Sequence, residues 1–385
     1  MDVQRTAATE IVIRGGEVLL PGRGFQRCDV VVDGGNIIEI TPNASYAGAQ
    51  VVDAGGSLVL PGIVDIHGDA FERQIMPRPK TLFPLELATL ETDSQLAANG
   101  ITTAFHGITI SWEPGLRSLP EAQRIIAAID AAEPLLLVDN RLHLRWETYA
   151  IDEVPAVIQL MQRAKRPVLA FNDHTTPTLA GSRNDSKVKS AAERGLVDVP
   201  TYLNLLDAQG ERQSEISAAI DILADIANET GITMLSHDDT SADMRKSFRS
   251  HGVRIAEFPM NWETIEYAAS NGDIIVLGSP NVVRGGSHNG SIGAEEAVRR
   301  GQCHVLASDY YYPAPLNAAF GLANAGAMSL ADAWSLVSSA PARATGLADR
   351  GQIAPGLRAD LIVVRRDCRR PLLTMSGGRI VYRAD

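Results

Sequence analysis

The chain has 385 residues, of which 45% are hydrophobic and 21% are charged, and its formal net charge is −11. This composition suffices for one large domain and one small one, and it argues against a disordered chain. The negative charge disfavours nonspecific binding to nucleic acid or to membranes, but it is compatible with a local basic pocket for a phosphorylated substrate.

The expected location of the protein is the cytoplasm. The N-terminal stretch MDVQRTAATEIVIRGG lacks the basic start, apolar core and cleavage site of a secretory signal. No apolar run approaches the roughly 20 residues that span a bilayer. The cysteines, Cys28, Cys303 and Cys368, are scattered without a C-x-x-C pair, so we expect free thiols in a reducing compartment.

Both ends of the chain are predicted to form β-strands. Residues 1–60 contain short apolar runs separated by turns such as Gly34-Gly35, and residues 347–385 repeat this pattern around a second Gly-Gly turn. Since chain ends often lie close together, the two segments are expected to pair into one small β-sandwich. The alternative is that they form two independent edge hairpins.

The segment between these ends, residues 61–346, alternates between strand and helix patterns. Stretches such as EISAAIDILADIANE place Ile216, Ile220, Leu223 and Ala227 on one helix face. The short apolar runs lie at 61–67, 100–107, 141–147, 167–174, 231–239, 252–259, 273–281 and 303–311. This alternation predicts an α/β fold, a (β/α)8 TIM-type barrel. No G-x-G-x-x-G follows the first run, which disfavours a doubly wound sheet.

One segment is too long for a compact strand–helix unit. Residues 175–213 separate the run at 167–174 from the next helix pattern. Loops of this length in a compact domain tend to be lids or partner surfaces. We therefore expect residues 175–213 to form a lid over the C-terminal face of the barrel.

Imidazole and carboxylate side chains gather at the predicted strand ends, where barrels of this kind carry their chemistry. These residues are His67, Asp69, Glu147, His174, His237 and Asp309. Taken singly, each has a structural explanation, since strand-end histidines are often only hydrogen-bonded and carboxylates such as Asp238 and Asp239 can cap a helix. Together they predict a metal site that suits zinc, manganese or iron better than calcium or magnesium.

The predicted centre holds two divalent ions, with zinc as the first expectation. A bridging carboxylate such as Glu147 would place the ions about 3.5–4 Å apart and lower the pKa of a shared water molecule. Asp309 is the expected general base. His143 and Arg145 share the face of Glu147 by strand alternation. His143 is an alternative ligand to Glu147, and Arg145 is expected to contact an anionic substrate or to orient Glu147.

The stretch GSPNVVRGGSHNG, residues 278–290, is a candidate anion-binding loop after the seventh predicted strand. Barrels often bind phosphate after strands seven and eight, and glycines let the backbone approach a ligand closely. An ordinary glycine-rich loop is the alternative. The residues expected to bind the substrate anion are Arg284, Gly285, Gly286, Ser287 and His288, together with Arg145, Arg78 and Lys80.

This combination of motifs resembles the amidohydrolase superfamily. The stretches LPGIVDIHGDAFER, PRPK, RLHLRWE, NDH, SHDD, IAEFP, PNVVRGGSH and SDYYYPA run in this order from about Leu58 to Pro313. They look like the family of α-D-ribose 1-methylphosphonate 5-triphosphate diphosphatases of the carbon–phosphorus lyase pathway. The resemblance implies that water attacks the phosphorus nearest the ribose and releases pyrophosphate. It also implies that the six strand-end residues hold the metals, with Asp309 as the base.

Two positions depart from the pattern of that family. Gly68 stands where threonine is usual, which is tolerable because this side chain points away from the ligands. After His174 the usual Asp-His-Ser/Thr-Pro-Gly-Gln is replaced by DHTTPTLAG, close to where the substrate would bind.

Three functions therefore stay open at this point. The first is the diphosphatase, whose ligand would be a small phosphorylated sugar. The second is a C–N hydrolase of cyclic or N-acyl amides on the same scaffold, because fold alone does not fix chemistry. The third is a metal-binding non-enzyme that docks partners through residues 175–213. A homo-oligomer is compatible with each of them.

Overall fold

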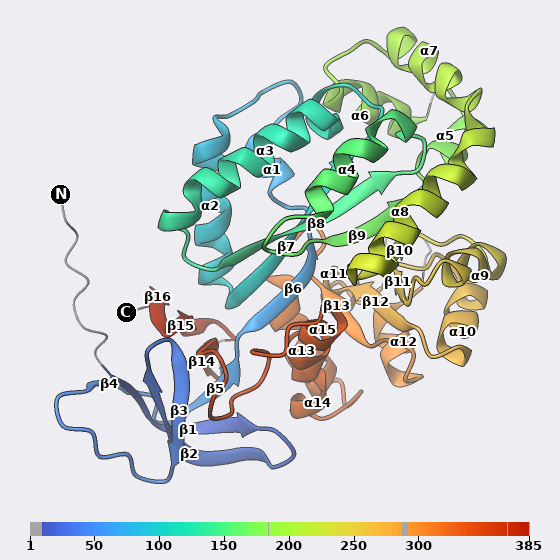
Figure 1. The fold of residues 1–385 in the computed structure, drawn as a ribbon. Helices are drawn as coiled ribbons and strands as arrows, with labels where there is room; N and C mark the ends of the chain where they lie inside the picture. Colours follow the sequence, from blue (N-terminus) through green and yellow to red (C-terminus); the bar gives the residue numbers. More distant parts are fainter. Residues whose placement is uncertain (1–9, 184, 287–291, 368, 385) are drawn as a thin grey trace.

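A parallel barrel forms the body of the protein (Figure 1). The computed structural model describes residues 10–183, 185–286, 292–367 and 369–384, and within these ranges eight barrel strands follow one another in chain order. They are β6 (Ile63–Gly68), β7 (Ile101–Ile110), β8 (Asp139–Glu147), β9 (Val168–Asn172), β10 (Met234–His237), β11 (Ile255–Glu257), β12 (Ile274–Gly278) and β13 (Val305–Ala307). The predicted barrel is confirmed.

Backbone hydrogen bonds bring the last strand of the barrel back to the first. The Asp309 N–H donates to the His67 carbonyl at 2.8 Å, and the Asp69 N–H donates to the Asp309 carbonyl at 2.9 Å. These bonds lie just beyond β13 and at the end of β6. The same contacts that bring the two edges together therefore also place three predicted site residues beside one another.

Helices cover the outside of the barrel, because parallel neighbours need long crossovers and strands buried on both faces need apolar cover. In the helix Ile216–Thr230, Leu223 and Ala227 are buried while Ile216 and Ile220 are half-buried, as the spacing predicts, and Gly231 ends it with φ 69°. The helices are α1 (Glu72–Ile75), α2 (Leu85–Ala98), α3 (Leu119–Ala132), α4 (Val154–Met161), α8 (Ile216–Thr230), α9 (Ala242–Ser250), α10 (Trp262–Ser270), α11 (Ser279–Val283), α12 (Ala294–Arg299), α13 (Ala314–Asn324), α14 (Leu330–Ser335) and α15 (Ser339–Ala344).

Strands from both chain ends form a second, mixed sheet. Figure 1 shows the blue and red strands side by side. They are β1 (Ile11–Leu20), β2 (Gly24–Asp33), β3 (Asn36–Thr41), β4 (Gln50–Asp53), β5 (Ser57–Pro61), β14 (Leu361–Arg365), β15 (Pro371–Ser376) and β16 (Arg379–Arg383). The two ends join where β5 and β14 pair antiparallel, with Leu361 opposite Pro61 and Arg365 opposite Ser57. The predicted pairing of the chain ends is confirmed.

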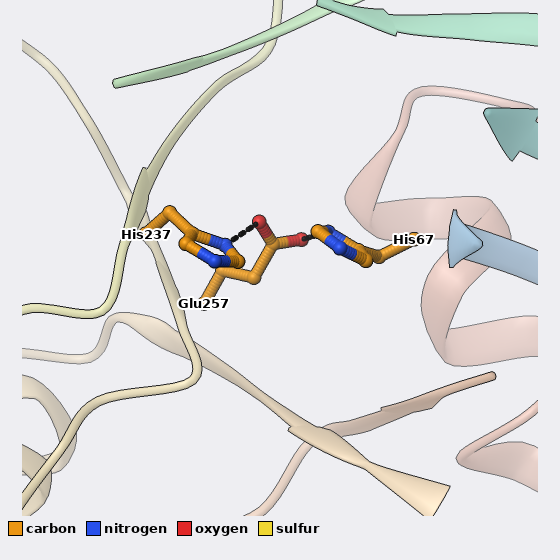
Figure 2. Close-up of side chains that lie close together, drawn as sticks. All are labelled: His67, His237 and Glu257. Carbon is orange, nitrogen blue, oxygen red and sulfur yellow. Dashed lines mark hydrogen bonds and ion pairs between the residues drawn. The ribbon is translucent and has the colours of Figure 1, made fainter. Parts of the chain in front are cut away.

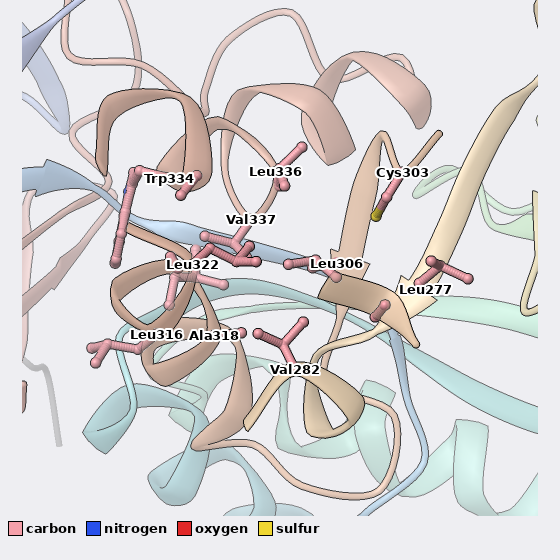
Figure 3. Packing of buried hydrophobic residues seen from close by; sticks show 14 of the residues in the cluster. Leu277, Val282, Cys303, Leu306, Leu316, Ala318, Leu322, Trp334, Leu336 and Val337 are labelled. Carbon is pink, nitrogen blue, oxygen red and sulfur yellow. The ribbon is translucent and has the colours of Figure 1, made fainter. Parts of the chain in front are cut away.

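One hydrophobic cluster runs from this terminal sheet into the barrel layer. Figure 3 shows the part of it around Leu277, Leu306 and Trp334. The cluster joins Leu58 of β5 and Ile362 of β14 to Leu277 and Leu306 of the barrel strands. Trp334 belongs to the same cluster, and its indole N–H donates to the carbonyl of the last β5 residue at 3.0 Å. Because β5 leads directly into the start of β6, the terminal sheet lies at the end of the barrel opposite to the strand ends that carry the donors.

Residues 175–213 are helical rather than an irregular loop. They contain α5 (Thr175–Ala180), α6 (Ser186–Arg194) and α7 (Val199–Gly210), followed by a 3-10 turn at Gln213–Glu215. Val188, Ala191, Ala192, Tyr202 and Leu206 form a small core of their own. We call this segment the insertion. In the described part of the chain, no helix has the length and apolar character needed to cross a membrane.

Candidate metal centre

Histidine and acidic side chains converge at the C-terminal ends of the barrel strands. Three groups of potential ligands have donor atoms within 4.8 Å of one another in the described chain. They are His67, His237 and Glu257; His174, His237 and Asp238; and His67, Asp69 and Asp309. Five of the six predicted ligands belong to these groups. His67 is common to the first and third groups, and His237 to the first and second.

Glu257, the last residue of β11, lies between two of these histidines (Figure 2). Its Oε2 lies 2.8 Å from His237 Nδ1, and its Oε1 lies 2.9 Å from His67 Nδ1. Carboxylates commonly hold one ring nitrogen of a ligating histidine and leave the other nitrogen free for the metal. Glu257 thus holds the His237 ring by a hydrogen bond and contacts the His67 ring, and the planes of the two rings differ by only 14°. The sequence interpretation did not include Glu257, although it ends the run at 252–259 as Glu147 ends the run at 141–147.

His143 lies beneath this group and is fully buried. Its Nδ1 is 2.8 Å from the Ile66 carbonyl, which can only accept, so Nδ1 carries the hydrogen and Nε2 does not. The free Nε2 lies 3.6 Å from Glu257 Oε2. Burial lowers the pKa of His143 to about 4, so the ring is a neutral donor at neutral pH. His143 is therefore chemically suited to be the alternative ligand.

Asp238 completes the second group through an unusual backbone turn. Directly after β10 its φ is 58°, and its Oδ2 lies 3.4 Å from His174 Nε2 and 3.6 Å from His237 Nε2. The helix α9 that follows is capped by Ser241, whose hydroxyl accepts from the Met244 N–H. Asp238 thus faces the histidines, and the helix-cap role considered for it belongs to Ser241.

The third group joins the two edges of the barrel. Asp309 also has a left-handed backbone, with φ 54°, which turns its carboxylate toward His67 and Asp69. Burial and the nearby charge of Asp69 raise the pKa of Asp309 to about 7. A carboxylate with this pKa can accept a proton near neutral pH.

Gly68 separates His67 from Asp69, and the structure explains why this residue lacks a side chain. A Cβ there would lie 2.8 Å from Asp65 Oδ2 and 3.2 Å from Ser308 Oγ. The Asp65 carboxylate cannot easily move, because it accepts from the Ser308 N–H at 2.9 Å and from its hydroxyl at 2.5 Å. Glycine at this position therefore fits a locally crowded strand end.

Glu147 is turned toward the backbone of the next strand end. Its Oε1 accepts from the N–H groups of His174 at 3.1 Å and Thr175 at 3.2 Å, and from the Thr175 hydroxyl at 2.8 Å. Its other oxygen lies 3.7 Å from His174 Nδ1. Burial raises the pKa of Glu147 to about 7. In this arrangement Glu147 holds the turn that presents His174, and its role as a bridging ligand stays a prediction.

Arg145 places a buried positive charge inside the centre. Its side chain is 4% exposed, with Nη1 3.4 Å from Asp69 Oδ2 and Nη2 3.1 Å from His237 Nε2. Burial and this charge together lower the pKa of His67 to about 3 and that of His237 well below its usual value. Both imidazoles are neutral at pH 7, which is the form that binds metal.

The donor set fits divalent cations. Carboxylates from Asp69, Asp238, Glu257 and Asp309 crowd around the imidazoles of His67 and His237, and the Arg145 guanidinium lies beside them. Buried anionic groups in excess are stabilised when cations bind between them. Imidazole with carboxylate is a ligand combination that suits zinc, manganese and iron.

Apart from Arg145, the described residues that were predicted to bind the substrate anion are not among the donor groups of this centre. Arg284 is exposed, with Nη1 3.4 Å from the Tyr310 hydroxyl, and Gly285 and Gly286 have positive φ values of 75° and 145°. Arg78 and Lys80 are exposed on the loop between α1 and α2. Ser287 and His288 lie outside the described residues. The substrate-binding roles of these residues stay predictions.

Two cavities open at this end of the barrel. One, of about 260 Å³, is lined by the metal-centre residues, among them His67, Arg145 and Asp309; we call it the metal cavity. The other, of about 450 Å³, lies between the barrel and the insertion; we call it the insertion cavity. Lys187 of α6 and Asp238 line both, so the two cavities adjoin.

Comparisons with known proteins agree with this architecture. In sequence, the chain is 32% identical over 332 residues to the α-D-ribose 1-methylphosphonate 5-triphosphate diphosphatase of Escherichia coli (strain K12), covering 82% of this chain and 85% of the relative. It is 25% identical over 407 aligned positions to a dihydroorotase of Pelotomaculum thermopropionicum, covering 94% and 90%. The solved structure of D-hydantoinase from a Bacillus sp. AR9 matches with TM-score 0.67 at 14% identity, covering 97% of this chain and 95% of that one.

A family model gives the same assignment. The model described as "Amidohydrolase family" matches residues 58–381, which include every barrel strand and the strands β14 and β15 of the terminal sheet. The match therefore covers both the fold and the donor groups at its strand ends. The chain belongs to the amidohydrolase family and is a metal-dependent hydrolase of that superfamily.

Proposed function

We propose that the protein hydrolyses the triphosphate chain of α-D-ribose 1-methylphosphonate 5-triphosphate and releases pyrophosphate. The observation that carries this proposal is the 32% identity to the E. coli diphosphatase over 82% of the chain. The site supports it, because a base with a raised pKa and a buried arginine suit attack by water on a negatively charged phosphorus. The ligand is then a small phosphorylated sugar rather than nucleic acid or a membrane.

The residues that would hold metal follow from the donor groups. When bound, two divalent ions, zinc first with manganese or iron as alternatives, would lower the pKa of water and polarise phosphoryl oxygens. The candidate ligands are His67, Asp69, Asp309, His174, His237 and Asp238, with Glu147 as the predicted bridging carboxylate and His143 as its alternative. Glu257 would hold the histidine rings in place.

The side chains have distinct tasks in the reaction. The oxygen of a water molecule forms a bond to the phosphorus nearest the ribose, and the bond from this phosphorus to the pyrophosphate oxygen breaks. Asp309 accepts the proton from the water, since its pKa of about 7 makes its carboxylate an effective base near neutral pH. Arg145, buried in the metal cavity, offsets negative charge on the phosphoryl oxygens.

A second candidate is hydrolysis of a cyclic amide. The match to a dihydroorotase over 94% of the chain favours it, although the identity is lower at 25%. The DHTTPTLAG segment after His174 also departs from the diphosphatase pattern. Paired metal ligands and an aspartate base are equally suited to attack by water on an amide carbonyl.

One assay separates the two candidates. Zinc- or manganese-loaded protein is incubated with the ribosyl triphosphate and, separately, with dihydroorotate, a hydantoin and N-acyl amino acids. We expect pyrophosphate release from the triphosphate, and Asp309→Asn should lower kcat at least about 100-fold because the base is lost. Asp207→Asn, which alters an exposed ion pair on α7, is the control and should leave kcat unchanged. Cleavage of amides alone would show that the proposed function is wrong.

A further inference from the structure

Two arginines contact one tyrosine at the C-terminal end of the barrel. Tyr310 directly follows Asp309 in the chain. The guanidinium carbon of Arg73 lies 5.5 Å from the centroid of the Tyr310 ring, and Arg284 donates from Nη1 to the Tyr310 hydroxyl at 3.4 Å. We call Arg73, Arg284 and Tyr310 the rim cluster. Arg284 was predicted to bind the substrate anion, but neither of its two neighbours was.

The rim cluster comes from the strand ends at which the barrel closes. Arg73 lies in α1, four positions after Asp69 at the end of β6. Arg284 ends α11 after β12, and Asn281, which is one helical turn before it, lines the metal cavity. Tyr310 follows β13. The third donor group of the metal centre joins the same edges of the barrel, so the rim cluster lies beside that group.

Neither arginine of the rim cluster pairs with a carboxylate in the described part of the chain. Glu72 precedes Arg73 in the chain, but both of its oxygens accept from Arg117, at 2.9 Å each. The Asp69 carboxylate likewise faces Arg145, at 3.4 Å. Two exposed guanidinium groups therefore lie at the same ring without a counter-charge, in a chain whose net charge is −11. Like charges repel each other, and an anion bound between them would remove this repulsion.

Guanidinium groups are especially suited to phosphorus oxyanions. Their planar fork donates two parallel hydrogen bonds to two oxygens of one phosphoryl or phosphonyl group. The Tyr310 ring restrains Arg73 through a cation–π contact, and its hydroxyl restrains Arg284, so less side-chain freedom is lost when an anion binds. The position fits as well, because barrels often bind phosphate in the loops after strands seven and eight, which are β12 and β13 here.

We propose that the rim cluster binds a phosphorus oxyanion of the substrate while the phosphorus that water attacks lies at the metal centre. This inference rests on the proposed diphosphatase function and adds residues that recognise a second anionic group. The proposed substrate carries two such groups, the distal phosphates of its triphosphate chain and its methylphosphonate. Both are tetrahedral and carry negative oxygens, so two arginines suit either of them. A neutral cyclic amide carries neither.

The test uses two probes, each with one of these groups. Inorganic tripolyphosphate has no methylphosphonate, and α-D-ribose 1-methylphosphonate 5-phosphate has no distal phosphates. Kd of each probe for zinc-loaded protein is measured by calorimetry, beside KM for the full substrate. Arg73→Gln and Arg284→Gln should each raise KM, and Kd of at least one probe, about tenfold, the effect of one lost charge-assisted hydrogen bond. The probe that responds identifies the group that the rim cluster binds.

Two further variants separate direct binding from indirect effects. Arg73→Lys keeps the charge but loses the fork, so it should recover only part of the affinity. Arg27→Gln also removes an exposed arginine that has no carboxylate partner among the described residues, but it lies in β2 of the terminal sheet and should change no constant. Added KCl should weaken binding less in Arg73→Gln than in the wild type, because salt screens the interaction that this variant lacks.

The outcomes separate this inference from the proposed function. If the wild-type protein releases pyrophosphate but Arg73→Gln and Arg284→Gln leave KM and both Kd values within twofold of wild type, the rim cluster is not an anion site and the proposed function stands. A rise in zinc affinity alone would also overturn the inference, since the arginines would then only offset the acidic residues of the metal centre. If the wild-type protein does not cleave the ribosyl triphosphate, the proposed function is wrong, and the two Kd values still decide whether the rim cluster binds oxyanions.

Discussion

Glu257 lies between two candidate ligand histidines, hydrogen-bonded to His237 Nδ1 at 2.8 Å and 2.9 Å from His67 Nδ1. Glu257→Gln keeps the size of the side chain but replaces one oxygen, which faces His67 or His237, with an NH2 group. Because an N–H cannot accept from an imidazole Nδ1–H, one ring loses its partner. We expect the affinity for zinc to fall about 10- to 100-fold, measured by competition with a chelator.

The control for this change is Glu39→Gln, which alters the partner of Tyr46 in the terminal sheet and should leave zinc affinity unchanged. The melting temperature of the metal-free protein must be measured beside it, because Glu257 is fully buried. Burial raises the pKa of Glu257 to about 7, so a neutral glutamine is tolerated there more readily than at a surface ion pair. Unchanged zinc affinity in Glu257→Gln would show that the carboxylate does not act through the histidines.

Individual site residues were only partly predictable from the sequence. The rule that barrel chemistry sits at strand ends selected His67, His237 and Asp309, because the strands themselves were visible as apolar runs. The rule could not decide between Glu147 and Glu257, since both end a strand and the direction of each side chain depends on its neighbours. The left-handed backbone at Asp238 and Asp309 could not be read from the sequence either, because it depends on packing at the C-terminal end of the barrel.

Among the helices and strands, those of the insertion were not predicted, because the length of residues 175–213 indicated a loop. Residues 175–213 were expected to be a loop, but α6 and α7 lie within them, each directly after an aspartate, Asp185 or Asp198, whose side chain caps the helix. These N-cap residues, and the apolar spacing within α6, were present in the sequence. Whether the insertion moves as a lid stays a prediction.

The attachment of the insertion to the barrel can be tested at Glu113. This side chain accepts from Arg194 of α6 at 2.8 Å and from the hydroxyl of Tyr202 of α7 at 2.9 Å, so one carboxylate joins both helices to the segment after β7. Glu113→Ala leaves Arg194 without its partner and should weaken docking by about 3 kcal/mol or more. We expect proteolysis within 181–213 to become at least tenfold faster while the barrel stays intact.

The control within the same insertion is Asp207→Asn. Asp207 pairs with Arg183 at the surface, where the side chains are 49% and 56% exposed, so Asp207→Asn should leave the proteolysis rate unchanged. Equal proteolysis rates for the wild type and Glu113→Ala would show that this carboxylate does not hold the insertion in place.

The overall fold was more predictable from the sequence than the arrangement of side chains in the site. The eight strands matched apolar runs, because strands buried on both faces read as continuous hydrophobic stretches. The joining of the chain ends followed from similar strand patterns at both termini. The arrangement of those ends as one mixed sheet did not, since the pairing of β5 with β14 spans about 300 positions of sequence.

The two parts of the molecule are also joined by a buried charge network whose pH dependence can be predicted. Arg350 donates from Nη1 to Asp139 of β8 at 2.7 Å and lies 4.0 Å from Asp360, next to β14. Burial would raise the pKa of Asp139, but Arg141, Arg350 and Lys165 outweigh it and lower this pKa from 3.8 to about 2. The lowered pKa stabilises the folded protein by about 2 kcal/mol above pH 4, and this contribution is lost as the pH falls toward 2. Asp139→Asn should therefore lower the free energy of unfolding in urea by about 2 kcal/mol at pH 7, and the difference from wild type should shrink steadily below pH 4. A difference that stays constant down to pH 2.5, or one matched by Asp152→Asn at an exposed pair, would contradict the role of this network.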